Sequence, residues 1–224
     1  IIISDDASDA RNGAIIRALP HDKLVLARRN SGLGANCNRG LAAATGDYVL
    51  QMQDDWITVG APTYLQTAVS VLNGNDDIGL VTFRPRPDLD APARRTFESH
   101  AIQLIQPRLN AAGSIDAVAD GIYTDNPHLK RRNFHDIVGL YAEGIPMTHM
   151  ELAMSRAVVH QPQIQVAFIE GYEVFRHIGA ASSFNPGTRR HQQLEALGQL
   201  PGGNGLIALG RQIRRWWRGP GASA

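Results

Sequence analysis

Apolar and polar positions follow two alternating patterns along the chain up to Phe83. Short apolar runs, each followed by polar residues or glycine, predict β-strands at residues 1–4, 24–27, 48–52 and 78–83. Between them, apolar residues recur three or four positions apart, which predicts helices after Asp9, near residues 35–45 and at residues 62–74. Because strands alternate with helices, the pattern favours an α/β fold with a mostly parallel, Rossmann-like sheet and flanking helices.

The boundaries of the first two helices carry capping signals. Ser8 or Asp9 is predicted to cap the first helix, because short polar side chains accept a hydrogen bond from the first turn. Gly46 is predicted to end the second helix as its C-cap. The inward residues of the first helix are expected to be Ile15, Ile16 and Leu19.

The pattern weakens after Phe83 and becomes regular again near residue 147. Prolines and arginines predict a long loop with short elements at residues 84–110, and residues 123–132 read as a polar turn. A helix is predicted at residues 147–160, and strands at residues 164–169 and 172–175. Within the polar turn, residues 130–132 form a small basic patch that is too short to indicate nucleic-acid binding.

Three of the predicted strands end in polar clusters, namely residues 5–6, 29–30 and 54–55. Because the carboxyl ends of parallel strands meet at one edge of a sheet, where ligands bind in open α/β folds, we expect the clusters to converge there. Two adjacent acids, Asp54 and Asp55, could hold a divalent cation through oxygen ligands, and that cation could hold a diphosphate. The alternative is turn chemistry, since Asp is common in turns.

Glycines precede the second predicted helix at Gly32 and Gly34. Such glycines let backbone N–H groups approach a phosphate at a helix N-terminus. A tight turn with a left-handed residue explains them equally well.

Composition narrows the function classes. The chain has 22 Lys and Arg residues against 21 Asp and Glu, a net charge of +1 that does not favour a nucleic-acid partner. The single Cys37 excludes an internal disulfide and favours a reducing compartment. No apolar run approaches the ~20 residues needed to span a bilayer.

Three motifs in this order and spacing resemble glycosyltransferase family 2. They are Ile-Ser-Asp-Asp-Ala-Ser-Asp at residues 3–9, Arg-Asn-Ser-Gly-Leu-Gly-Ala-Asn at residues 29–36, and Gly-Asp-Tyr at residues 46–48 leading to Gln-Asp-Asp at residues 53–55. The resemblance implies the GT-A fold and the inverting, metal-dependent transfer of a sugar from a nucleotide-diphosphate donor to a hydroxyl. The metal would be Mn²⁺ or Mg²⁺.

The resemblance also assigns roles to residues. Asp5 and Asp6 would contact the nucleotide base, and Asn30 and Asn36 are further expected substrate contacts in the second motif. Asp54 would contact the ribose.

The metal would fall to Asp55, the last acid of the third motif. The usual Asp-x-Asp is not intact, because Gln53 stands where its first acid would be.

The family's first strand is expected before Ile1 and is absent from this sequence. It would lie between the strands at residues 1–4 and 48–52, so we expect a gap in the central sheet there. The sequence is therefore expected to be a fragment of a longer protein, poorly stable and inactive by itself.

Two interpretations of Glu151 stay open. Thr148 and Glu151 have capping-box spacing, which would make Glu151 a structural residue. The resemblance instead implies a general base near the start of this helix, where His149-Met150 occupies the usual acidic pair and Glu151 is shifted by one. A helix N-terminus would hold that carboxylate ionised. Glu143 and Asp136 are the next candidates.

The predicted glycosyltransferase domain covers residues 1–200, and residues 201–224 form a linker and a basic amphipathic helix. His177 follows a late strand, where the resemblance implies a metal or diphosphate contact. A hydrogen-bonded surface histidine is the alternative. In the helix at residues 206–218, tryptophans and leucines face one side and arginines the other, which predicts contact with a membrane surface. Packing of that stripe on the catalytic domain is the alternative.

The expected partners are a nucleotide-sugar donor and a glycan or lipid-linked acceptor, as in bacterial cell-envelope polysaccharide synthesis. The expected location is cytoplasmic, with peripheral contact to the inner membrane face. Two other functions remain open: a nucleotidyltransferase, and a non-catalytic nucleotide-sugar-binding module in which Gln53 has ended catalysis.

Overall fold

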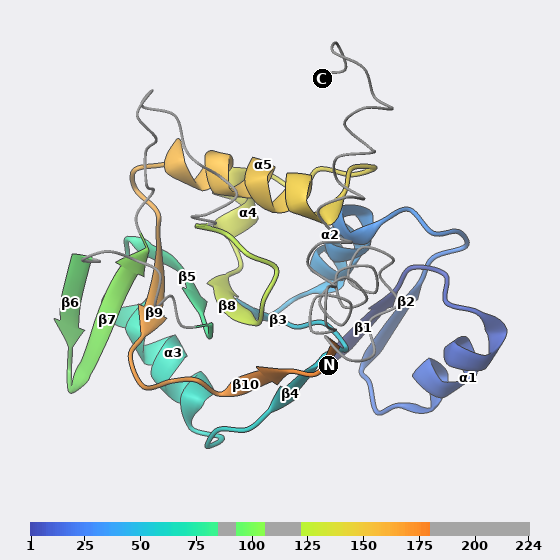
Figure 1. The fold of residues 1–224 in the computed structure, drawn as a ribbon, viewed down its shortest axis with the longest axis horizontal. Helices are drawn as coiled ribbons and strands as arrows, with labels where there is room; N and C mark the ends of the chain where they lie inside the picture. Colours follow the sequence, from blue (N-terminus) through green and yellow to red (C-terminus); the bar gives the residue numbers. More distant parts are fainter. Residues whose placement is uncertain (85–92, 106–121, 180–224) are drawn as a thin grey trace, which may run out of the picture. The chain divides into compact units, whose positions relative to one another are not determined.

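The computed structural model describes residues 1–84, 93–105 and 122–179 (Figure 1). The chain divides into two compact units, Ile1–Arg176 and His177–Ala224. The predicted domain boundary at residue 200 and the predicted helix at residues 206–218 lie outside the described residues. Among the described helices, none combines the length and apolar character needed to cross a bilayer.

The described elements alternate strands and helices up to β5, as the sequence pattern predicts, except for the short β4, which follows β3 directly and was not predicted. In chain order they are β1 (Ile2–Asp5), α1 (Ala10–Ala18), β2 (Lys23–Leu26), α2 (Leu33–Ala43), β3 (Tyr48–Gln51), β4 (Trp56–Thr58), α3 (Tyr64–Gly74), β5 (Ile78–Thr82), β6 (Ala93–Phe97), β7 (His100–Ile105), β8 (His128–Arg131), α4 (Phe134–Val138), α5 (Met147–Val159), β9 (Gln165–Ile169) and β10 (Phe175–His177). The α/β class is therefore confirmed.

The central sheet is mixed, which corrects the expectation of a mostly parallel one. Its six strands lie in the order β3-β8-β5-β9-β7-β6. Only β5 and β9 pair in parallel in this sheet, and β8 runs antiparallel to both β3 and β5. The antiparallel β6–β7 hairpin closes the other side. Strand β8 and this hairpin lie in segments that the sequence pattern assigned to turns and loops.

A second, two-stranded sheet joins β1 and β2 in parallel, with Ile3 opposite Leu24. Among the described strands, β1 pairs with β2 and β3 pairs with β8, so no ladder links β1 to β3. The gap expected between these two strands is present in the structure.

The hydrophobic core lies in two layers, one on each face of the six-stranded sheet (Figure 1). Val81 and Ala167 pack in the layer of α3, whereas Leu80 and Val166 pack in the layer of α4 and α5. Helix α2 joins the second layer through Leu33, Cys37 and Leu41. The strand alternation thus sends neighbouring residues to opposite helical layers.

The predicted helix ends are partly right. Asp9 caps α1, because its side chain accepts a hydrogen bond from the N–H of Asn12 at 2.8 Å. Ile15 and Leu19 are 54% and 48% exposed, so the predicted inward face of α1 is wrong at these two residues, whereas Ile16 is partly buried. Helix α2 ends at Ala43 with Ala44 as its C-cap, not at Gly46.

Candidate active site

The end of β1 is joined to the glycine-rich turn by the Asp6 carboxylate. It accepts hydrogen bonds from the N–H of Ser31 at 2.9 Å and from the N–H of Gly32 at 2.7 Å. Gly32 has φ +88°, a left-handed conformation that glycine adopts without strain, and it precedes α2 as its N-cap. Asn30 closes the same turn, because its side-chain oxygen accepts from the N–H of Gly32 at 3.2 Å.

Helix α2 is held against β1 by the side chains of Asn36 and Arg39. The amide of Asn36 donates to the carbonyl of Ser4 at 3.0 Å and accepts from the Ser4 hydroxyl at 2.7 Å. The Arg39 guanidinium forms an ion pair with Asp6. The structure therefore brings Asp6, Asn30 and Asn36 together around one turn, where each has a partner within the protein.

Asp5 lies at the same strand end but closes a different turn. Its carboxylate accepts from the N–H of Ser8 at 3.0 Å and from the Ser8 hydroxyl. Within that turn, Ala7 has φ +66°, a conformation that costs energy for a residue with a Cβ. The contacts of Asp5 with Ser8 stabilise this turn at the end of β1.

Gly34 has a packing role. A Cβ built on it would lie 2.2 Å from the carbonyl oxygen of Ala142, so only glycine lets α2 approach that segment. The tight-turn interpretation is therefore confirmed at Gly32, and close backbone approach explains Gly34.

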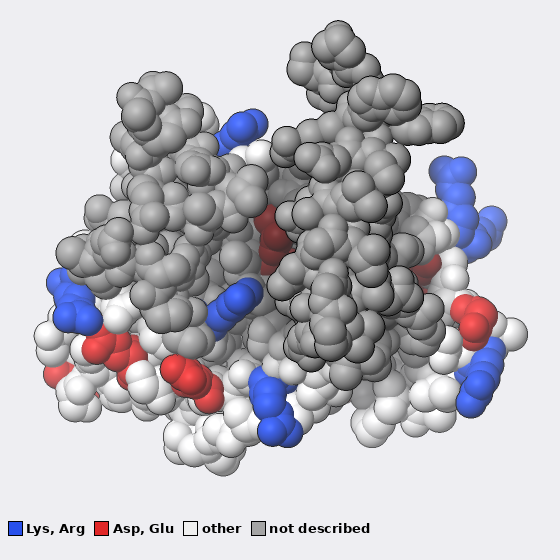
Figure 2. Space-filling model, in the orientation of Figure 1, with Lys and Arg blue, Asp and Glu red and all other residues white. Residues whose placement is uncertain are grey.

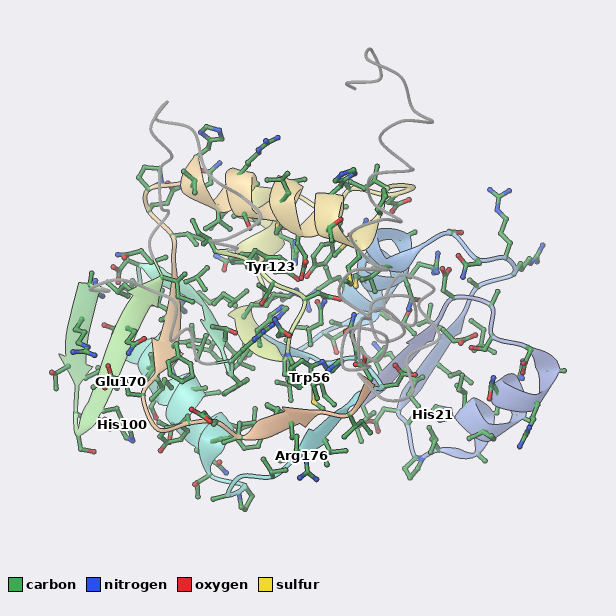
Figure 3. All side chains as sticks on the ribbon, in the orientation of Figure 1. His21, Trp56, His100, Tyr123, Glu170 and Arg176 are labelled. Atoms are coloured by element: carbon green, nitrogen blue, oxygen red, sulfur yellow. The ribbon has the colours of Figure 1, made fainter. Side chains whose placement is uncertain are left out.

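The third motif lies just beyond the last paired residue of β3. Gln51 is opposite His128 in the ladder, and the chain then turns through residues 52–55 before β4 begins at Trp56 (Figure 3). Asp54 is exposed and Asp55 is partly buried. Both carboxylates thus sit in the turn that follows β3, at one edge of the six-stranded sheet, and the sequence predicts their place at this strand end.

Asp125, which the sequence analysis did not single out, holds this strand end. It is 4% exposed, and its two carboxylate oxygens accept from the Gln51 amide at 2.7 Å and the Gln53 amide at 2.6 Å. Burial, and then the nearby charge of Glu151, raise the pKa of Asp125 to about 7. Its titration therefore falls near neutral pH.

A buried lysine completes the network on the other side of Gln51. Lys130 is fully buried and donates to the Gln51 side-chain oxygen at 2.8 Å and to the Tyr141 hydroxyl at 2.8 Å. Burial lowers the pKa of Lys130 to about 7. The Tyr141 hydroxyl also contacts that of Tyr123, which lies under α5 (Figure 3). The exposed basic patch predicted at residues 130–132 is therefore wrong at Lys130.

Glu151 lies one turn into α5, and its carboxylate accepts from the backbone N–H of Asp125 at 2.8 Å. The N-cap of α5 is Pro146, and Thr148 lies inside the helix, so the capping-box interpretation is wrong. Burial is the main influence on Glu151 and raises its pKa, which the N–H of Asp125 partly offsets. The expectation that the helix N-terminus dominates is therefore also wrong, because dipole effects fade beyond the first turn.

His177 is exposed at the end of β10 and begins the second compact unit. Its role at a metal stays a prediction. On the face drawn in Figure 2, acidic and basic side chains of the described residues form small separate groups of both signs.

The described residues contain no group of three or more His, Cys, Asp or Glu side chains placed to hold a metal ion. Among the described residues, the candidate ligands for a divalent cation are therefore Asp54 and Asp55. Their oxygens suit Mg²⁺ or Mn²⁺, and Mg²⁺ is usually bound through one or two carboxylates together with substrate phosphates and water. The pair fits a cation that is completed by its substrate.

Glycosyl transferase family 2 matches residues 1–161, which include all three motifs and Glu151. The chain belongs to this family. No curated protein matches it.

Solved structures with similar folds belong to TarS of S. aureus. Residues 1–349 of TarS match with a TM-score of 0.51 and 14% identity, over 78% of this chain and 49% of that one. The same fragment in complex with UDP-GlcNAc matches with a TM-score of 0.49 and 14% identity, over 82% and 52%. This chain thus spans about half the length of these structures.

One sequence signal could have pointed to Asp125 in this family 2 chain. Gln51 ends an otherwise apolar strand and Gln53 follows two residues later, so two amides at one strand end call for polar partners nearby. The sequence does not reveal which residue satisfies them, because Asp125 lies more than 70 positions away: the separations are 74 and 72 residues.

Proposed function

We propose that this chain transfers a sugar from a nucleotide-diphosphate donor to a hydroxyl acceptor, with inversion at the anomeric carbon. One observation carries the proposal: Glu151 is partly buried, fixed by the N–H of Asp125, and joined through Asp125 to the strand end that bears the acidic motif. Family membership supports the reaction class.

Glu151 is the proposed general base. It takes the proton of the acceptor hydroxyl as the acceptor oxygen bonds to the anomeric carbon. The bond from that carbon to the diphosphate oxygen breaks, and the nucleoside diphosphate leaves with the electron pair. A base works best when its pKa lies near the working pH, and burial raises the pKa of Glu151 in that direction. A single displacement needs no protein nucleophile.

The donor is proposed to bind against the turn that contains Gly32. Asp5 and Asp6, together with Asn30 and Asn36, would hold the nucleotide end. Because Asp6 and Asn36 already bind Gly32 and Ser4, part of their contribution would be to fix the shape of this turn.

Asp55 is proposed to bind a Mn²⁺ or Mg²⁺ ion, and Asp54 to contact the ribose beside it. When bound, the cation would supply neutralisation of the charge that develops on the departing diphosphate. His177 is a further proposed ligand of the ion or of the diphosphate.

The test is calorimetry with a panel of nucleotide sugars, UDP-GlcNAc among them, with and without Mn²⁺, followed by a transfer and hydrolysis assay. We expect metal-dependent donor binding and turnover, and we expect Asp55→Asn to lose the metal dependence. Unchanged Mn²⁺ dependence in Asp55→Asn would refute the metal assignment.

Gln53 favours a second candidate, a nucleotide-sugar-binding module without catalysis, because it replaces an acid of the family motif. Donor binding with no transfer or hydrolysis for any sugar in the panel would establish this alternative.

A glycan or lipid-linked acceptor is proposed, with residues 206–218 lying on an anionic membrane surface. Each arginine near such a surface contributes about 1 kcal/mol of attraction. Liposome flotation at low salt tests this: loss of binding on removal of residues 206–224 supports it, and unchanged binding refutes it.

A further inference from the structure

Residues 53–55 of the third motif lie between two strands, after the β3–β8 ladder and before β4. Strand β3 pairs with β8 up to Gln51, and residues 52–55 form the turn before β4. The side chain of Gln53 is the tether beyond the ladder, and it is held by Asp125 at 2.6 Å. Asp54 follows Gln53 directly and Asp55 leads into β4 at Trp56, so this contact holds the start of the acidic turn.

The Asp125 carboxylate holds two points on the strand at once. One oxygen accepts from Gln51 and the other from Gln53, so the carboxylate spans the last ladder position and the second position beyond it. Gln51 cannot turn its amide over without loss, because its oxygen accepts from Lys130 and Tyr141. The direction of each hydrogen bond is therefore fixed by the network.

The backbone of the same residue holds the other half of the site. The N–H of Asp125 donates to the Glu151 carboxylate at 2.8 Å. One residue thus contacts both the strand that leads to the acidic motif and the carboxylate proposed as the base.

We propose that Asp125 is a positioning residue for the transfer reaction, because it sets the acidic motif through Gln53 and the Glu151 carboxylate through its backbone N–H. This inference rests on the proposed function. It assigns a task to a residue outside the three motifs, and it gives Gln53 a role as a hydrogen-bond donor.

The chemistry of the contact allows a swap test. Asp125→Asn places an amide against the amide of Gln53 or Gln51, and Gln53→Glu places a carboxylate against the carboxylate of Asp125. The double variant, Asp125→Asn with Gln53→Glu, restores one donor and one acceptor with their direction reversed. The N–H of residue 125 is present in all three variants, so the Glu151 contact is kept.

The experiment measures kcat, the donor KM and the Mn²⁺ concentration for half-maximal activity, each corrected for the folded fraction by thermal melting. Gln163→Glu and Asp76→Asn are matched controls at exposed positions outside the three motifs and should leave these values unchanged. We expect each single variant to lower kcat/KM for the donor by ~10²-fold, since small misplacements of catalytic groups have effects of this size. The half-maximal Mn²⁺ concentration should rise with it.

Recovery of most of this loss in the double variant would support the inference, because a merely structural role would change the folded fraction and leave the corrected kcat and the Mn²⁺ response unchanged in every variant. The inference is overturned if the wild-type chain is active and the double variant is no better than the single ones, or if the single variants lose only folded fraction. Absence of donor binding and turnover in the wild-type chain would refute the proposed function, and the inference with it.

Discussion

Two carboxylates hold loops at strand ends in this molecule, and they do so with different partners. Asp6 binds the N–H groups of Ser31 and Gly32 together with the Arg39 guanidinium. Asp125 binds two neutral side-chain amides and is buried, which raises its pKa to about 7. The Asp6 carboxylate accepts from backbone N–H groups and a charged guanidinium, which are strong donors. The Asp125 carboxylate accepts from neutral amides, which are weaker donors, and it is buried away from water.

The two regions therefore differ in what sequence can reveal. The partners of Asp6 all lie in the next strand-turn-helix segment of the chain. A short stretch of sequence therefore contains the whole arrangement. The network around Asp125 joins Gln51, Lys130 and Tyr141 across the sheet, with Lys130 79 positions from Gln51. Loops held by contacts that are close in sequence can be recognised from their motifs. Buried polar networks between strands that are distant in sequence can be recognised only once the fold is known.

The largest effect on activity is expected from substitution of Glu151, whose carboxylate is held by the N–H of Asp125. Glu151→Gln should lower turnover by ~10²-fold or more, with donor affinity nearly intact, because the variant keeps the hydrogen bond from Asp125 but cannot accept the acceptor proton. Steady-state kinetics and donor calorimetry measure the two effects separately. Glu143→Gln is the comparison, since Glu143 binds Asn38 on the surface. A larger loss in Glu143→Gln would move the base there.

In the motif region, the largest effect on stability should come from Gly34→Ala. The new Cβ would lie 2.2 Å from the carbonyl oxygen of Ala142, so α2 or that segment must shift, at a cost of about 2 to 3 kcal/mol. Gly40→Ala in the same helix is the control. Its Cβ would meet Ser4 at 3.5 Å, an ordinary contact, so it should stabilise by about 0.5 to 1 kcal/mol. Equal denaturant midpoints for the two variants would contradict the packing role of Gly34.

Hydrophobic periodicity was enough to find β1, β2, β3, β5 and the helices between them, whereas the short β4 was not predicted. It failed at β8, whose residues His128, Lys130 and Arg131 read as a polar turn although the first two are fully buried. A lysine can lie there only because Gln51 and Tyr141 accept its hydrogens. The β6–β7 hairpin was missed for a related reason, since Arg95 lies partly buried against Asp77.

In the candidate active site, too, some features follow from the sequence and others only from the fold. The positions of Asp6, Asn30 and Asp55 follow from their motifs, and Glu151 was placed near the start of α5 correctly. Its environment was not predictable, because it depends on the N–H of Asp125, which comes from a different part of the chain. The chain begins α5 at Met147, so Thr148, a good capping residue by type, falls inside the helix.

The buried network should also make the unfolding free energy depend on pH. The folded-state pKa of Lys130 is lowered from 10.5 to about 7, so between these values the unfolded chain holds a proton that the folded chain lacks. Stability contributed by this group is present above pH 10.5 and is lost as the pH falls toward 7. The unfolding free energy should rise between pH 7.5 and 9.5 by about 1 kcal/mol per pH unit.

Lys130→Met should remove or invert that rise, because no proton is then released on folding and the pKa of Asp125 loses a lowering influence. Lys23→Met alters the other lysine of the chain, which is exposed and donates to the carbonyl of Ala43. It should leave the slope as it is in the wild type. Denaturant unfolding at several pH values measures it, and an identical slope in both variants would contradict the buried state of Lys130.

The smallest effect is expected at a local contact of the motif region. Asp9→Ala removes the acceptor for the N–H of Asn12 at the start of α1, which should destabilise the protein by about 1 kcal/mol. Asp9→Ser keeps a capping oxygen and should retain most of the stability, whereas Ser8→Ala tests the neighbour that does not cap this helix. Because Ser8 binds Asp5 instead, Ser8→Ala should loosen the turn of Ala7 without exposing the first turn of α1. Amide hydrogen exchange separates the two results: protection of the Asn12 N–H should fall in Asp9→Ala and persist in Ser8→Ala. Equal loss of protection in both variants would mean that the turn and the helix cap form one unit, and that even the local contacts of this region are cooperative.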